Sequence, residues 1–164
     1  MPSSLIRSAT ASDAAAIAEI YNPYVRDTII TFEEEPVTPS EMASRIEKVT
    51  KAYPWIVWEE DGRVIGYAYG STWRSRHAYR FATETTIYLD QARLRSGIGT
   101  RLYQALIDEL RRYGYHSALG CLGLPNDPSV ALHEKLGFQK VGHMREAGWK
   151  FGAWVDVGFW ELML

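Results

Sequence analysis

The stretch RLRSGIGT, at residues 93–100, places two glycines and a cluster of arginines where a strand leads into a helix. Such a loop presents unpaired backbone N–H groups at the positive end of the helix dipole, where a phosphate or pyrophosphate can bind. Arg93, Arg95 and Arg101 could pair further phosphate charge. Two better-known nucleotide motifs do not fit, because Leu102 replaces a third glycine and no Gly-Lys-Ser/Thr follows. Alone, the stretch favours an ordinary turn.

The chain is also rich in large aromatic residues, with six tryptophans and ten tyrosines. Many of them lie in the segments TWRSRHAYRF and GWKFGAWVDVGFW. Large rings in such loop-like, glycine-spaced segments often line a ligand pocket or a subunit interface, although core packing is the commoner role of any single ring.

Periodicity and turn residues predict the elements that position these groups. Residues 81–89 form a strand with Glu84, Thr86 and Tyr88 on one face and Thr83, Thr85 and Ile87 on the other. The order β-α-α-β-β-β-α-β-α-β-β predicts a mixed α/β sheet. We expect further strands at 4–10, 54–60, 64–71 and 116–124, helices at 13–24, 39–52, 97–113 and 128–136 (the last capped by Asp127), and two final strands within 139–164 joined by a long glycine-rich loop.

Length and composition limit the functional classes. The 164 residues suit a single domain, 1–164. A hydrophobic fraction of 46% and a net charge of −2 argue against a disordered chain and against a basic nucleic-acid binder, so a small soluble ligand is the expected partner. No apolar run approaches the roughly 18 residues of a membrane span, and we expect a cytoplasmic protein. The single cysteine, Cys121, excludes an internal disulfide and a cysteine zinc cluster; a buried structural role is expected.

The segment NDPSVALHEKLGF follows the glycine loop one strand later. This order of strand, glycine loop, helix, strand, Asn and short helix resembles the core of the GNAT superfamily of acetyl-CoA-dependent N-acetyltransferases, over essentially the whole chain. ITFEEEP, YPWIVWEEDGRVIGYAYGSTWRSRHAY, TETTIYL and AGWKFGAWVDVGFW look like its phosphinothricin and methionine sulfoximine acetyltransferase branch. The resemblance implies a largely antiparallel central sheet flanked by about four helices, acetyl-CoA as co-substrate, no metal, and a homodimer.

The resemblance also assigns residues to the cofactor. The family motif Gln/Arg-x-x-Gly-x-Gly/Ala holds the CoA pyrophosphate with backbone amides and matches residues 94–99, but Leu94 stands at its first position. Asn126 would bond the pantetheine arm, with turn formation as the alternative. The expected cofactor-binding residues are Ile87, Tyr88, Leu89, Arg95, Ser96, Gly97, Ile98, Gly99, Thr100 and Asn126.

Two residues are candidates for the chemistry. An amine is mostly protonated at pH 7, so acetyl transfer needs a base, and Glu84 matches the glutamate that the family uses, directly or through a water. The alternative is a solvated strand residue. His133 stands where many members have a tyrosine that protonates the departing thiolate. It could equally serve in capping or core hydrogen bonding.

The acceptor would need a cation for its carboxylate and an aromatic wall. The resemblance implies Phe32, Arg74, Arg76, Tyr79, Thr83 and Glu84 as substrate-binding residues, with surface or packing roles as alternatives for the arginines and Phe32. Trp149, Lys150 and Trp154 are expected in the pocket, in a dimer contact, or in plain packing.

The leading hypothesis is therefore direct acetyl transfer from acetyl-CoA to the α-amino group of a small glutamate-like amino acid, such as phosphinothricin or methionine sulfoximine. Two alternatives stay open. One is a GNAT enzyme for another amine, such as a peptide N-terminus. The other is a non-catalytic acetyl-CoA sensor.

Overall fold

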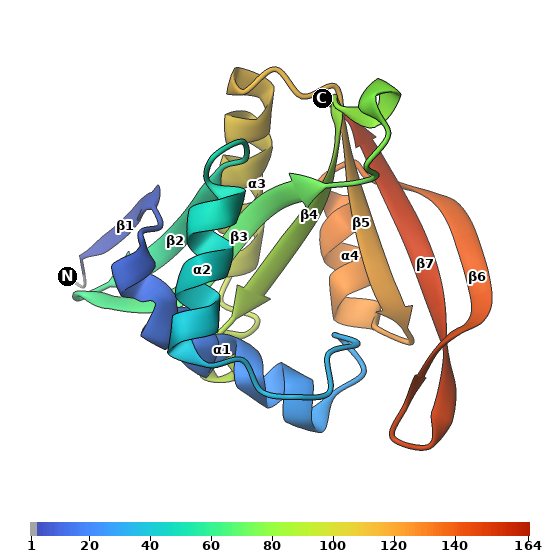
Figure 1. Cartoon of the computed structure of the whole chain (residues 1–164), viewed down its shortest axis with the longest axis horizontal. Coiled ribbons are helices and arrows are strands. Elements are labelled where there is room, and N and C mark those ends of the chain that lie inside the picture. Colours follow the sequence, from blue (N-terminus) through green and yellow to red (C-terminus); the bar gives the residue numbers. More distant parts are fainter. Residues whose placement is uncertain (1–2) are drawn as a thin grey trace.

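A seven-stranded sheet runs through the centre of the molecule in the computed structural model, which describes residues 3–164 (Figure 1). The strand order is β1-β2-β3-β4-β5-β7-β6, and every pair is antiparallel except β4 and β5. The predicted class, a mixed and largely antiparallel sheet, is confirmed. The strands are β1 (Ser4–Ser8), β2 (Trp55–Glu60), β3 (Arg63–Thr72), β4 (Ala82–Leu89), β5 (Ser117–Leu124), β6 (Gln139–Lys150) and β7 (Ala153–Met163).

Helices cover both faces of the sheet, and their number agrees with the expected four. They are α1 (Ala14–Asp27), α2 (Pro39–Val49), α3 (Ile98–Arg112) and α4 (Asp127–Lys135). On one face α1 and α2 bury Ile17 and Ile46 against Tyr67 of β3. On the other face Leu102 and Leu106 of α3 pack with the neighbouring strands and with residues of α4 and β7. Within residues 3–164, no helix is both long and apolar enough to cross a membrane.

The parallel pair β4 and β5 is joined over only three residues of each strand. Ala82–Glu84 pairs with Ser117–Leu119, and no further pairing between the two strands follows. Beyond Glu84 the strands diverge, as Figure 1 shows. Because neighbouring strands normally saturate each other's backbone groups, this divergence leaves the β5-facing edge of β4 open.

Most element boundaries agree with the prediction to within one or two residues, and two helix ends differ by three. Helix α1 continues to Asp27, with Pro23 inside it, and α2 ends at Val49 instead of residue 52. Asn126, rather than Asp127, caps α4, because its side chain accepts a hydrogen bond from the Ser129 N–H.

The predicted glycine-rich loop near the C-terminus is wrong. Instead, β6 and β7 form a hairpin whose turn consists of Phe151 and Gly152 alone. Both residues have positive φ, 54° and 71°, as the type I′ form of a two-residue hairpin turn requires. A register shift between Met144 and Gly148 accommodates the irregular part of β6 within the sheet.

Candidate active site

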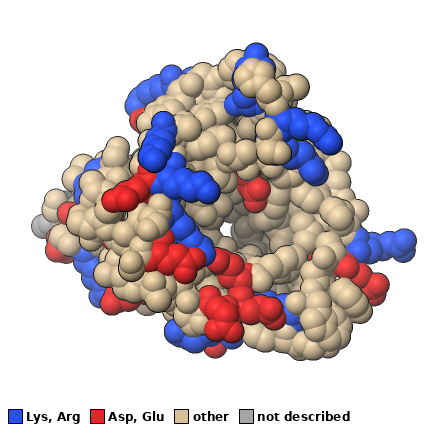
Figure 2. Space-filling view, in the orientation of Figure 1, with Lys and Arg blue, Asp and Glu red and all other residues tan. Residues whose placement is uncertain are grey.

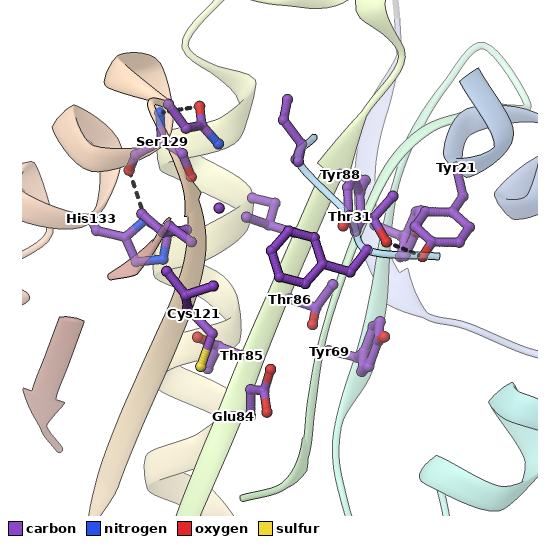
Figure 3. A pocket seen from close by; sticks show the side chains of 18 of the residues that line it. Tyr21, Thr31, Tyr69, Glu84, Thr85, Thr86, Tyr88, Cys121, Ser129 and His133 are labelled. Carbon is purple, nitrogen blue, oxygen red and sulfur yellow. Dashed lines mark hydrogen bonds between the residues drawn. The ribbon is translucent and has the colours of Figure 1, made fainter. Parts of the chain in front are cut away.

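A cavity of about 380 Å³ lies where β4 and β5 diverge. Figure 2 shows the corresponding hollow at the centre of this face, with an acidic side chain inside it and both basic and acidic side chains around it. In Figure 3, His133 and Ser129 lie on one side of the cavity, Tyr21 and Thr31 on the other, and Glu84 and Cys121 between them. Residues from the N-terminal half of the chain and from its C-terminal half therefore line the same cavity.

Glu84 ends the paired part of β4 and points into this cavity (Figure 3). Burial raises the pKa of its carboxyl above the ordinary value. A carboxylate that has lost much of its water shell is a stronger proton acceptor than an exposed one. Glu84 therefore has the position and the environment of a general base.

Cys121 of β5 lines the same cavity, and it is half-buried rather than fully buried as expected. Burial and the nearby Glu84 carboxylate raise the pKa of its thiol to about 12. At neutral pH the thiol stays protonated and is a poor nucleophile. Although Cys121 lines the cavity, its protonated thiol is therefore not a candidate for covalent catalysis.

His133 of α4 reaches the cavity, but hydrogen bonds occupy both of its ring nitrogens. Nδ1 lies 2.7 Å from the carbonyl oxygen of Ser129, and Nε2 lies 2.9 Å from the hydroxyl of Tyr103. Burial lowers the pKa of His133, so the neutral ring donates to Ser129 and accepts from Tyr103. The Thr85 hydroxyl lies 2.5 Å from that of Tyr103, and a side chain on Gly120 would bring Cβ within 2.4 Å of Nε2. The ring is thus fixed by its surroundings.

Tyr103 was missed from the sequence because a tyrosine among the apolar positions of a helix looks like any other core residue. Tyr103→Phe is expected to lower the free energy of unfolding by about 1–3 kcal/mol, since His133 Nε2 then becomes a buried acceptor with no partner. Urea denaturation of wild type and variant measures this difference. Leu106→Ile, at a neighbouring buried position of α3 without a polar group, is the packing control. A Tyr103→Phe protein as stable as wild type would contradict the assigned network.

The glycine loop forms the N-terminus of α3. Gly97 precedes the helix with φ of 80°, and Arg95 also has a positive φ, 63°. Alternation of such conformations makes a concave set of backbone N–H groups, and the first-turn amides of α3 have no helical acceptor. Arg93 is held by Glu60 at 2.5 Å, and Arg101 stacks over the ring of Trp58. The loop can therefore receive an anion mainly through its backbone.

The expected pantetheine contacts lie between this loop and Glu84. Ile87 and Tyr88 line the cavity along the open edge of β4. Leu89 is absent from this lining, and its carbonyl accepts a hydrogen bond from the Tyr24 hydroxyl at 2.6 Å. Asn126 lines the cavity while it caps α4, so its two anticipated roles are compatible in position.

The structure separates the expected acceptor residues into groups. Phe32 lines the cavity, whereas Arg74, Arg76 and Tyr79 lie outside its lining in the exposed segment between β3 and β4. The charge of Arg74 nevertheless offsets a small part of the rise in the pKa of the Cys121 thiol that burial and Glu84 cause. Arg74 is therefore close enough to act electrostatically on the cavity.

Thr83 is a correction to the expected acceptor site. Its side chain is fully buried beside Gly70 and Leu110 of α3, and its hydroxyl donates to the Ser71 carbonyl at 3.0 Å. Thr83 is not among the residues that line the cavity, and its buried hydroxyl is occupied by the backbone of β3. We remove Thr83 from the acceptor site.

A polar cluster that sequence reasoning missed contributes Tyr21 and Arg45 to the lining of the cavity that Glu84 enters. Arg45 of α2 binds both carboxylate oxygens of Glu33, at 2.9 and 2.6 Å, and lowers the pKa of that carboxyl. The Tyr21 hydroxyl bonds both Glu33 and the Thr31 hydroxyl. Arg45 lies four residues after Glu41, a spacing typical of a solvated helix face, which is why it gave no signal of a site.

The cavity lining does not include three residues near the C-terminus that were expected there, Trp149, Lys150 and Trp154. Trp149 and Trp154 are exposed on the β6–β7 hairpin, with ring centroids 4.9 Å apart. Lys150, between them in sequence, is buried. Of the roles expected for these residues, a direct place in the pocket does not fit this geometry.

Together, a half-buried carboxylate, an open strand edge and a helix terminus suited to an anion can serve acyl transfer from a phosphate-bearing carrier to an amine. Comparisons with known proteins agree with this chemistry. The sequence profile of the acetyltransferase (GNAT) domain matches residues 6–158. The chain is 44% identical to a phosphinothricin N-acetyltransferase of Streptomyces viridochromogenes, over 95% of this chain and 85% of that one.

A second relative is an L-methionine sulfoximine/L-methionine sulfone acetyltransferase of Salmonella typhimurium, 38% identical over 97% of this chain and 94% of the other. Among solved structures, a phosphinothricin acetyltransferase of Sinorhizobium meliloti in complex with acetyl-CoA superposes with a TM-score of 0.94. Its sequence is 38% identical, and the match covers 98% of this chain and 88% of that one. An acetyltransferase of Salmonella typhimurium solved with acetyl-CoA gives a TM-score of 0.95 at 37% identity, covering 98% and 94% of the two chains.

Proposed function

Since this chain belongs to the GNAT family of acetyltransferases, we propose that it transfers an acetyl group from acetyl-CoA to the α-amino group of a small amino acid such as phosphinothricin or methionine sulfoximine. The observation that carries the proposal is the placement of Glu84, a carboxylate with a raised pKa, in a cavity that continues along the open edge of β4 toward the α3 N-terminus. The charge of Arg74 and the aromatic side chains of the lining support a compact amino acid as acceptor.

The chain's own residues would divide the reaction as follows. Glu84 accepts a proton from the acceptor ammonium, directly or through one water, and the free amine then attacks the thioester carbonyl carbon. A C–N bond forms, the C–S bond breaks, CoA leaves as a thiolate, and the second proton of the attacking nitrogen passes to that thiolate or to water. A thiol with an ordinary pKa near 8.5 leaves without help at neutral pH. The occupied nitrogens of His133 support a positioning role for that residue rather than a role as acid.

The amides of residues 95–100 would hold the CoA pyrophosphate, with Arg95 adding charge from its exposed position. Ile87, Tyr88 and Asn126 would contact the pantetheine arm at the open edge of β4. At the other end of the cavity, Phe32 would form an aromatic wall, and Arg74, with Arg76 and Tyr79 beside it in sequence, would face the acceptor carboxylate.

Purified protein mixed with acetyl-CoA and a panel of amines tests the proposal when free thiol is followed. Thiol release with phosphinothricin or methionine sulfoximine, and none with a peptide N-terminus, is the expected result. Release with peptides alone would favour the other GNAT activity. Binding of acetyl-CoA without thiol release for any amine would favour a sensor. Activity with these amino acids would also give a cell resistance to them, and we propose the cytoplasm as the place of reaction.

We further propose that the protein forms a homodimer through the β6–β7 hairpin. Trp149, Phe151 and Trp154 are each at least 55% exposed there, and clustered exposed aromatic side chains mark interaction surfaces. Sedimentation velocity should give twice the 18.7 kDa chain mass for wild type and the chain mass for Trp154→Lys. Tyr113→Lys, a matched change of an exposed ring at the end of α3, should stay dimeric. A monomeric wild type would contradict the proposal.

A further inference from the structure

Lys150 is a lysine with almost no access to solvent, at 1% exposure. It is the last residue of β6, and its ammonium donates to the Val25 carbonyl at 2.9 Å and to the Thr31 carbonyl at 2.7 Å. Within residues 3–164, no carboxylate oxygen lies within ion-pair distance of this nitrogen. Burial lowers the pKa of the ammonium, and the charges of Glu34 and Glu33 partly offset this effect. The buried charge is therefore compensated mainly by backbone carbonyls.

The position of these carbonyls explains how the charge is tolerated. Val25 lies in the last turn of α1, where carbonyls have no helical partner and carry the negative end of the helix dipole. Burying an ammonium without hydrogen bonds is costly, and removing it here would leave two buried acceptors unpaired. The site thus depends on a long, protonated side chain.

The second carbonyl belongs to the segment that closes one side of the cavity, which we call the wall segment (residues 28–33). Ile30, Thr31 and Phe32 of this segment line the cavity. The Thr31 hydroxyl is bonded by Tyr21 at 2.6 Å, while its carbonyl is bonded by Lys150. The backbone and the side chain of one wall residue are therefore fixed by side chains from two different elements, β6 and α1.

Two glycines allow the wall segment to lie directly on the sheet. A Cβ on Gly148 of β6 would come within 2.4 Å of the Phe32 ring, and a Cβ on Gly123 of β5 within 2.6 Å of the Ile29 carbonyl oxygen. Gly148 is two residues before Lys150 on the same strand. β6 thus both supports the ring of Phe32 and anchors the neighbouring Thr31.

We propose that Lys150 is a positioning residue for the acceptor end of the site: its buried ammonium fixes the wall segment so that Thr31 and Phe32 close the cavity opposite Glu84. The assignment to the acceptor rests on the proposed function. The anchoring of the wall segment itself rests only on the contacts above. Lys150 touches neither substrate, and acetyl-CoA binding at the α3 N-terminus does not depend on it.

The test is Lys150→Met, which keeps the length of the side chain and removes its charge and donors. We expect the KM for the amino-acid acceptor to rise by about 10-fold or more, while kcat and the KM for acetyl-CoA change by less than about 3-fold. Lys51→Met, at an exposed lysine in the turn after α2, is the matched control and should leave all three constants unchanged. An acceptor KM like that of the control, or equal losses for both substrates, would overturn the proposal.

Hydrogen–deuterium exchange separates this proposal from the proposed function. Amides of residues 28–33 should exchange faster in Lys150→Met than in wild type, whereas those of β4 should not. If wild type acetylates no amino acid and this pattern still appears, the anchor stands and the acceptor assignment fails. If exchange in the wall segment is unchanged, the anchor itself is refuted. Should Lys150→Met fail to fold, Lys150→Gln, which keeps neutral donors, replaces it with the same expectations.

Discussion

Glu84→Gln is expected to lower kcat/KM for the amino-acid acceptor by about 100- to 1,000-fold, the usual contribution of a general base. Glutamine preserves the shape of the side chain but cannot accept a proton from the ammonium. In wild type, kcat/KM should rise with pH as Glu84 ionises, at a pH above the ordinary value of 4.5 because burial raises its pKa. In the variant this dependence should disappear and leave that of the acceptor amine.

The stability of the same variant separates chemistry from unfolding. The pKa of Glu84 is higher in the folded chain than in the unfolded chain, so the folded chain binds more protons between the two values. The free energy of unfolding therefore falls as pH rises through that window, and ionised Glu84 destabilises the protein at pH 7. Glu84→Gln should consequently unfold at the same or a higher temperature than wild type.

Glu47→Gln, the same substitution at an exposed residue of α2, is the matched control and should alter neither the turnover rate nor the stability. Assays of thiol release from pH 5 to 9 measure the turnover rate, and thermal unfolding at pH 7 measures the stability. Turnover of Glu84→Gln within about 3-fold of wild type across the pH range would exclude this residue as the base.

Gly97→Val has the second large expected effect, a loss of acetyl-CoA affinity of about 10- to 100-fold. Gly97 has φ of 80°, a left-handed conformation that costs a β-branched residue about 1–2 kcal/mol or more. No atom lies within 4 Å of the position that a Cβ would take, so the penalty comes from the backbone and not from a clash. Relief of that strain would turn the amides of the loop away from the pyrophosphate.

Leu94→Gln is the control variant for Gly97→Val. Leu94 is 51% exposed and occupies the place where the family motif has Gln or Arg, so the change adds a polar group without disturbing packing. Its effect on affinity should stay within about 3-fold if backbone amides supply most of the binding energy. Calorimetric titration with acetyl-CoA measures both variants. Equal and small effects would mean that RLRSGIGT is an ordinary turn.

Much of the fold could be predicted because its signals are local. The spacing of Leu102, Leu106 and Leu110 along α3 and the terminating Gly114 depend on a few neighbouring residues. Alternation along β4 placed Glu84 and Thr83 on opposite faces, although Thr83 was still expected in the acceptor site. The glycine loop was recognisable for the same reason, since its conformation is set by adjacent residues.

The sequence by itself determined the order of elements, the glycine loop before α3 and the presence of a carboxylate on the strand that leads to it. Only the tertiary structure decided that Arg45 lines the same cavity as Glu84, that Cys121 lies beside Glu84, and that Lys150 is buried. Lys150 bonds a carbonyl 125 residues away, and Arg45 binds a carboxylate 12 residues before it. The burial and the pKa of a side chain depend on contacts between segments that are distant in the sequence. Periodicity and spacing along the chain therefore do not predict them.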